Sequence, residues 1–147
     1  MKKVDQDMKD QFDQELIKQL KGLPHNATDK VLHPEKYREV IIKRALFFAT
    51  TARREGLLVL ESYLDEDLIL QRDVFEYGMK FVVDGTDATF IARILNNLIH
   101  QCKNPELRVS MIMQKEAVMM IQRGDNPKMI NYMLNSYTNC PLKKEDL

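Results

Sequence analysis

Residues 34–64 read PEKYREVIIKRALFFATTARREGLLVLESYL, and this stretch decides the fold class. Pro34-Glu35 predicts a helix start, because proline is tolerated at the first helical position and an acidic side chain suits the first turn. Small or apolar residues then recur at the helical steps of three and four, at Ala45, Ala49, Ala52, Gly56, Leu60 and Tyr63. The pattern predicts a single helix of about 30 residues that ends near Leu64. Glycine inside a helix costs on the order of 1 kcal/mol relative to alanine, so we expect another helix to pack closely at Gly56.

The segments on either side of this stretch also follow the helical period. Upstream, an apolar line at a spacing of four predicts an amphipathic N-terminal helix, built on Val4, Met8, Phe12, Leu16 and Leu20. Gly22 is expected to end that helix, because glycine adopts the left-handed conformation at little cost. Downstream, residues 65–67 form a short acidic break, and the next helix is predicted over residues 68–83.

Turn and cap residues separate the remaining helices. A helix running to Gln101 is expected to turn five apolar side chains inward: Phe90, Ile91, Ile94, Leu95 and Leu98. Two later helices should cover residues 105–123 and a segment from Met129 to Leu134. The candidate structural residues, which form turns and caps or permit close packing, are Gly56, Asp84, Gly85, Asp87, Asn104, Pro105, Gly124, Asn126 and Pro127.

These signals together predict an all-α fold of about six or seven helices. The chain divides into an N-terminal helix and loop (residues 1–30), a helical domain (31–139) and a polar tail (140–147) that we expect to be frayed. The helix over residues 105–123 is rich in methionine, which leaves two interpretations open. Methionine can form an adaptable docking surface, or it can simply fill a core.

Composition and charge exclude several classes of protein. The chain has 147 residues, with 22 basic and 22 acidic side chains, so it carries no net charge. A dedicated nucleic-acid binder has a basic excess, and we therefore expect no nucleic-acid partner. Cys102 and Cys140 are too few for a disulfide framework or a zinc set. No segment reads as a signal peptide or approaches the roughly 20 apolar residues of a membrane span, so we expect a soluble, cytoplasmic protein.

No set of residues matches a catalytic or metal site. His25, His33 and His100 lack the company and the spacing of metal ligands. Asp84 and Asp87 resemble a carboxylate pair but are explained as turn and cap residues. We therefore expect no enzymatic activity, no metal and no cofactor.

One face of the long predicted helix is charged. On a helical wheel with about 100° per residue, Lys43, Thr50, Arg54 and Glu61 fall within about 40° of one another. Two interpretations stay open, namely an ordinary solvated face or a row of charges offered to a partner protein. The candidate partner-binding residues are those of this face and its borders: Arg53, Arg54, Glu61, Lys43, Leu58 and Phe47.

Three motifs in order resemble the A-type stator subunits of the flagellar motor. Residues 52–61, ARREGLLVLE, are similar to the family motif A-R-x-E-G-L-L-x-L-E, and residues 83–87, VDGTD, are similar to the V-D-G-x-D that follows it. A third pattern is similar to the family's C-terminal helix, at Glu116, Ile121, Gln122, Gly124, Asn126, Pro127, Ile130 and Leu134. The three motifs cover residues 40–136.

The chain departs from this family in one respect. Stator subunits have one pair of membrane spans before the first motif and another between the second and the third. Here only residues 100–107 stand in the second place. The resemblance therefore implies the helical cytoplasmic part without the ion channel, either as a natural soluble paralogue or as a form with its spans removed.

The resemblance also implies a partner. In the family, an arginine and a glutamate of the first motif contact the rotor switch protein, and the matching positions are Arg53 and Glu61. We therefore expect a protein near the base of the flagellar motor that binds the rotor switch protein through the charged face. The alternative is a scaffold or regulator that docks on stator subunits or other motor components. Because family rings form mainly through the spans, we expect a monomer or a weak oligomer.

Overall fold

The computed structural model describes residues 33–147, and every regular element within them is helical, which confirms the predicted all-α class. The elements are α3 (Pro34–Glu55), η1 (Leu58–Tyr63), α4 (Glu66–Leu70), α5 (Val74–Val83), α6 (Ala88–Gln101), α7 (Pro105–Arg123), α8 (Pro127–Asn135) and η2 (Lys144–Asp146), where η marks a 3-10 helix. The helix predicted upstream, with its stop at Gly22, lies outside the described residues.

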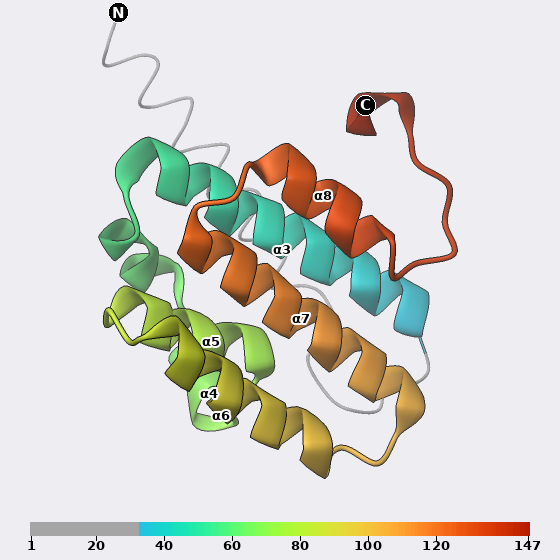
Figure 1. Ribbon diagram of the computed structural model, residues 1–147. Coiled ribbons are helices and arrows are strands. Elements are labelled where there is room, and N and C mark those ends of the chain that lie inside the picture. Colours follow the sequence, from blue (N-terminus) through green and yellow to red (C-terminus); the bar gives the residue numbers. More distant parts are fainter. Residues whose placement is uncertain (1–32) are drawn as a thin grey trace, which may run out of the picture.

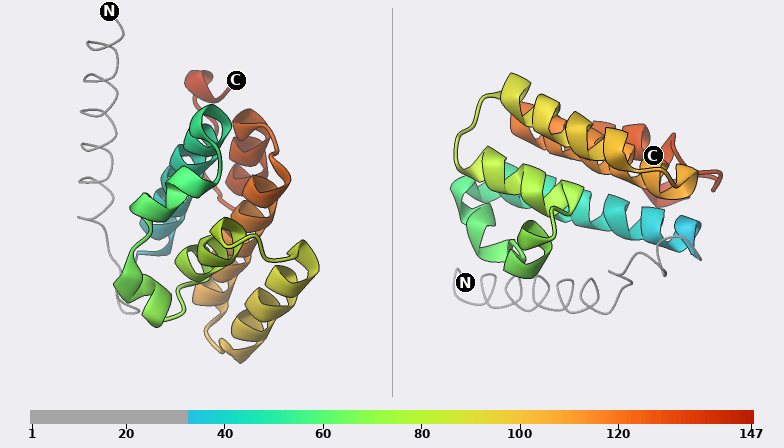
Figure 2. Two further views of the ribbon diagram at one scale, coloured as in Figure 1. Left: turned by 90° about the vertical axis from the view of Figure 1, so that its left-hand side faces the viewer. Right: turned by 90° about the horizontal axis from the view of Figure 1, so that it is seen from below.

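The helices are arranged in two layers (Figure 1). The view from below in Figure 2 shows α6, α7 and α8 in one layer, with α3 and α5 in the other and η1 and α4 beside them. Helix α7 packs on both α3 and α5, and α8 packs on α3. The long helix α3 and the central helix α7 therefore organise the fold.

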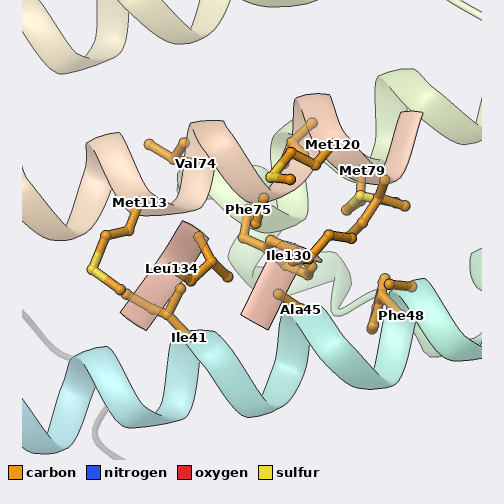
Figure 3. Packing of buried hydrophobic residues seen from close by; sticks show 14 of the residues in the cluster. Ile41, Ala45, Phe48, Val74, Phe75, Met79, Met113, Met120, Ile130 and Leu134 are labelled. Atoms are coloured by element: carbon orange, nitrogen blue, oxygen red, sulfur yellow. The ribbon is translucent and has the colours of Figure 1, made fainter. Parts of the chain in front are cut away.

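The hydrophobic core lies between the two layers, and Figure 3 shows side chains of α3 facing those of α5, α7 and α8. Five helices contribute large side chains with no exposed surface, namely Phe48, Met79, Leu95, Met113, Ile130 and Leu134. Burial of each such side chain contributes about 1.5–3 kcal/mol before the entropy of ordering it is counted. On α7, Met113 and Met120 belong to this core, which favours the core-filling interpretation of its methionines.

Helix starts follow the predicted capping signals. The side chains of Asn104 and Asn126 accept backbone N–H groups of the following turn at 3.0 and 2.9 Å, and Pro105 and Pro127 open the two helices. Asp87 caps α6 in the same way at 2.8 Å. Each bond satisfies a donor that the helix itself leaves free, so these caps are confirmed.

Helix ends use glycine where the backbone becomes left-handed. Gly124 ends α7 with φ 77° and ψ 28°, and Gly85 follows Asp84 at the end of α5 with φ 76°. A side chain in this region would be strained, whereas glycine is not. The predicted turn roles of these three residues are confirmed.

The predicted helix of about 30 residues is shorter in the structure, because α3 has 22 residues and ends at Glu55. Gly56 has φ 88° and ψ 166°, a combination that is essentially restricted to glycine. The chain then continues as the 3-10 helix η1, in which Leu60 is fully buried. Side chains three apart coincide in a 3-10 helix, so the apolar pattern continued past the true helix end.

The single helix predicted over residues 68–83 is also wrong, because α4 and α5 are separate. Arg72 lies between them with φ 57°. Asp65 and Asp73 each accept a backbone N–H from the residue three positions later, at 3.2 Å. Two aspartate caps within one stretch therefore start two helices rather than one.

The inward face predicted for α6 is partly wrong. Ile91 and Leu95 are fully buried, but Phe90 is 60 % exposed. Helix α6 lies at the edge of its layer and packs on α5 and α7, so only one narrow stripe of it is covered. In the polar tail, residues 144–146 form η2, which packs on α8.

Candidate protein-binding surface

The chain turns at Gly56, and this turn builds an exposed charged corner. Arg53 and Arg54 occupy the last turn of α3, where the helix dipole favours basic side chains, and both are exposed. Helix η1 begins two residues after the glycine and carries Leu58 and Glu61. The exposed surface formed by Arg53, Arg54, Leu58 and Glu61 is termed the corner surface below.

Glu61 reaches this surface from η1 rather than from α3. The helical wheel that aligned Glu61 with Lys43 and Arg54 extended α3 through Gly56, so that alignment is wrong. The side chain of Glu61 is nevertheless 64 % exposed. The turn at Gly56 therefore places the acidic group on η1, which packs on α3, rather than on the face of α3 itself.

Lys80 holds Glu61 loosely in place. Its Nζ lies 3.5 Å from Oε1 of Glu61 and 3.1 Å from Oδ1 of Asp84. The pKa of Lys80 is raised, chiefly by the hydrogen bond to Asp84 and to a lesser degree by Glu61. Exposed ion pairs of this kind contribute little and exchange readily, so Glu61 stays available to another cation.

Leu58 gives the corner surface an apolar centre. It is 76 % exposed, whereas Leu60 is fully buried and Leu57 is half-buried. An exposed leucine next to charged side chains matches the pattern of protein interfaces, which combine an apolar core with a polar rim.

Two predicted partner contacts lie away from the corner surface. Phe47 is only 7 % exposed, because η1 folds back on α3 and the ring of Tyr63 packs edge-on against it at 5.1 Å. The prediction that Phe47 contacts a partner is therefore wrong. Lys43 is exposed and pairs with Glu39 at 3.3 Å. It precedes Arg53 by ten residues, which places it about 15 Å away along the helix.

A cavity of about 210 Å³ opens beside Arg53, between the C-terminal ends of α3 and α7. Its lining is apolar on one side and polar at the rim: Ala49, Ala52, Arg53 and Leu57 from the α3 end, and Ile121, Gln122, Arg123, Gly124 and Asp125 from the α7 end. We term it the socket. Sequence reasoning did not predict it, because its two halves are far apart in the chain.

A larger cavity of about 310 Å³ lies near the start of α3, between that helix, α8 and the C-terminal segment. Contacts within the chain already satisfy its polar groups. Glu35 pairs with Arg38 at 3.0 Å, and Asn131 donates to Asp146 at 3.0 Å. We therefore favour the corner surface, where Arg53 forms no ion pair with any residue of 33–147.

A buried ion pair joins α3 and α5, and it was not predicted from the sequence. Arg44 of α3 pairs with the fully buried Glu76 of α5, and the second oxygen of Glu76 accepts the N–H of Asp65 at 3.1 Å. The guanidinium also lies over the rings of Phe48 and Phe75. Burial lowers the pKa of Arg44, although two nearby aspartates oppose the shift. The available signal was a glutamate at helical spacing from the apolar Met79 and Val83.

The described part of the chain brings together no group of three histidine, cysteine or carboxylate side chains that could hold a metal ion. Among residues 33–147, no helix is both long and apolar enough to cross a membrane. The corner surface and the socket offer charged side chains and apolar area at the C-terminal end of α3.

Comparison with known proteins adds no relative: no protein-family model, no curated protein and no solved structure matches this chain. The resemblance to flagellar stator subunits therefore depends on the three sequence motifs alone.

Proposed function

We propose that this protein is a non-enzymatic interaction protein of the flagellar motor, and that its corner surface binds the rotor switch protein. One observation carries the proposal: the motif ARREGLLVLE forms an exposed corner in which Arg53, Leu58 and Glu61 are all accessible. The three stator-like motifs supply the identity of the partner.

The charges of the corner suit a contact that forms and breaks repeatedly. Arg53 and Glu61 have opposite signs, so a partner must offer a carboxylate and a cation in the matching order. Such complementarity raises the association rate and fixes orientation, and close charge pairs can add affinity as well. Leu58 supplies the apolar contact that holds the complex together once it is oriented.

Charge reversal tests this proposal. The double variant Arg53→Glu, Glu61→Arg should bind purified rotor switch protein at least about tenfold more weakly than the wild type, since one close charge pair is worth about 1.5 kcal/mol or more. Lys43→Glu is the matched control, because Lys43 is an exposed cation on the same helix outside the corner. Wild-type affinity for the double variant, measured by titration calorimetry, would overturn the proposal.

A pull-down from motile cells decides between the two partner classes named by the resemblance. Capture of the rotor switch protein that is lost with the double variant supports the proposed contact. Capture of stator subunits that is unaffected by the double variant would instead identify a scaffold that docks elsewhere, with the corner surface left solvated.

A further inference from the structure

The socket has the form of a receptacle for one large side chain. Its volume is about 210 Å³, while a water molecule takes about 30 Å³ in the liquid, so it has room for a leucine or a phenylalanine side chain. Ala49 and Ile121 in its wall are each only 3 % exposed. The two alanines of α3 provide the depth, because any longer side chain there would fill the space.

The charges at the rim are not equivalent. The guanidinium of Arg123 donates two hydrogen bonds to Oδ2 of Asp125, at 3.1 Å from Nε and 2.7 Å from an Nη atom. These bonds raise the pKa of Arg123. Arg53 lies at the same rim and pairs with no acidic group in residues 33–147. A carboxylate arriving from outside would therefore meet Arg53 rather than Arg123.

The socket is continuous with the corner surface. Leu57 lines it, and the next residue, Leu58, is 76 % exposed at the corner. A partner segment lying across the end of α3 would cover Leu58 and pass over the mouth of the socket. Apolar anchors that enter a pocket near the centre of an interface commonly carry much of the binding energy.

We propose that the socket receives a large apolar side chain from the partner protein, and that a carboxylate adjacent to it in the partner's sequence pairs with Arg53. This inference rests on the proposed function, because Arg53 belongs to the corner surface. The apolar side chain supplies affinity through burial, and the carboxylate sets the direction in which the segment lies.

Filling the socket tests this inference without changing a charge. Ala52→Leu places a larger side chain in the cavity from α3, and Gln122→Trp does so from α7. Both variants should bind the rotor switch protein at least about tenfold more weakly, as expected when a buried anchor is excluded. Asn97→Leu is the matched control, because it places the same side chain at an exposed position of α6, outside both the socket and the corner surface, and its affinity should stay within about twofold.

Thermal unfolding by circular dichroism confirms that each variant is folded before its affinity is compared. If both Ala52→Leu and Gln122→Trp bind with wild-type affinity and unfold at the wild-type temperature, the proposed role of the socket is overturned. If those variants bind normally while charge reversal at Arg53 and Glu61 abolishes binding, the proposed function stands and only the socket fails.

A small peptide ligand tests the socket without assuming that the partner is the rotor switch protein. N-acetyl-phenylalanyl-glutamate amide, titrated at millimolar concentration, should shift the NMR methyl signals of Ala49, Ala52 and Ile121 in a saturable way. The glutamine analogue should bind about threefold more weakly, since it lacks the charge that pairs with Arg53. Absence of these shifts, or the same shifts in Ala52→Leu, would overturn the socket even if the rotor switch protein fails to bind the wild type.

Discussion

Glu76 illustrates how a single buried carboxylate can connect several elements. It lies on α5, pairs with Arg44 of α3 and accepts the backbone N–H of Asp65 at the start of α4. A buried charge is tolerated only when it is paired and hydrogen-bonded, and both conditions are met here. Helix α4 buries none of its own side chains, and this bond connects its N-cap residue to the buried ion pair.

Removal of one charge from this pair should be strongly destabilising. Glu76→Gln keeps the shape but leaves Arg44 without its counter-charge, and we expect a loss of about 3 kcal/mol in the free energy of unfolding. The double variant Arg44→Met, Glu76→Met removes both charges and should lose clearly less than Glu76→Gln. Urea unfolding gives both values, and a loss below about 0.5 kcal/mol for Glu76→Gln would show that the pair contributes little.

At the scale of elements, Gly56 decides where α3 ends. An added Cβ would meet no atom within 4 Å, so the close helix packing predicted at Gly56 is wrong and space is not the constraint. The constraint is the backbone, with φ 88° and ψ 166°. The corner surface exists because α3 stops here and η1 turns back along it.

Gly56→Ala should therefore destabilise the fold through backbone strain alone. We expect a loss of about 1–3 kcal/mol in the free energy of unfolding. Thr50→Ala, at an exposed position within the same helix, should change stability by less than about 0.5 kcal/mol. A stabilised Gly56→Ala, measured by urea unfolding, would mean that α3 can continue through position 56, as its apolar pattern suggests.

Gly78 permits a close approach between α5 and its neighbours. A Cβ at this position would lie 2.9 Å from Cγ2 of Val118 on α7 and 3.1 Å from Cδ1 of Leu95 on α6. Both contacted side chains are fully buried, and valine has little rotamer freedom. Helix α5 therefore packs against α6 and α7 at a distance that only glycine allows at position 78.

Gly78→Ala has two opposite effects on the free energy of unfolding. Alanine gains about 1 kcal/mol of helix propensity, whereas overpacking costs about 1–3 kcal/mol. We expect a net loss of up to about 2 kcal/mol. The loss should shrink when Val118→Ala is introduced as well, because the clash is then removed, and a double-mutant cycle without such coupling would contradict the packing explanation.

At the scale of the whole molecule, the net charge is zero, but basic and acidic side chains are unevenly distributed along the chain. Residues 33–57 hold six basic and three acidic side chains, whereas residues 58–87 hold two basic and eight acidic ones. The corner surface lies at the boundary of these two regions. A partner that contacts both Arg53 and Glu61 would therefore need groups of both signs, which favours one orientation of approach.

Hydrogen bonds of Asp146 attach the C-terminal segment to the helical domain. Its carboxylate accepts the N–H of Lys143 at 2.8 Å and the side-chain amide of Asn131 at 3.0 Å. These bonds lower the pKa of Asp146 from its ordinary value of 3.8, with the Lys143 bond as the larger cause. The attachment is therefore fully present above pH 3.8 and is lost as the pH falls through the lowered value.

Acidification should consequently release this segment before the core unfolds. The side-chain amide signals of Asn131, followed by NMR, should move to solvent-exposed positions only as the pH falls below 3.8. Asp146→Asn should show the released position at neutral pH and no further change on acidification. An Asn131 signal that is insensitive to both changes would contradict the attachment.

The sequence by itself determined the class of fold and most helix starts. The caps at Asp87, Asn104 and Asn126 join residues two or three positions apart, so the local sequence contains both partners of each bond. The same holds for Arg53 and Leu58, which lie within one motif and are exposed as a partner contact requires. Whether a partner binds them stays a prediction.

Only the tertiary structure decided which residues meet across the chain. It ended α3 at Glu55, buried Phe47 under Tyr63 and paired Arg44 with Glu76. It also assembled the socket from residues 49–57 and 121–125. The physical reason is that a helical period records which side of one element is apolar, whereas burial, ion pairs and cavities depend on which other elements pack against that side.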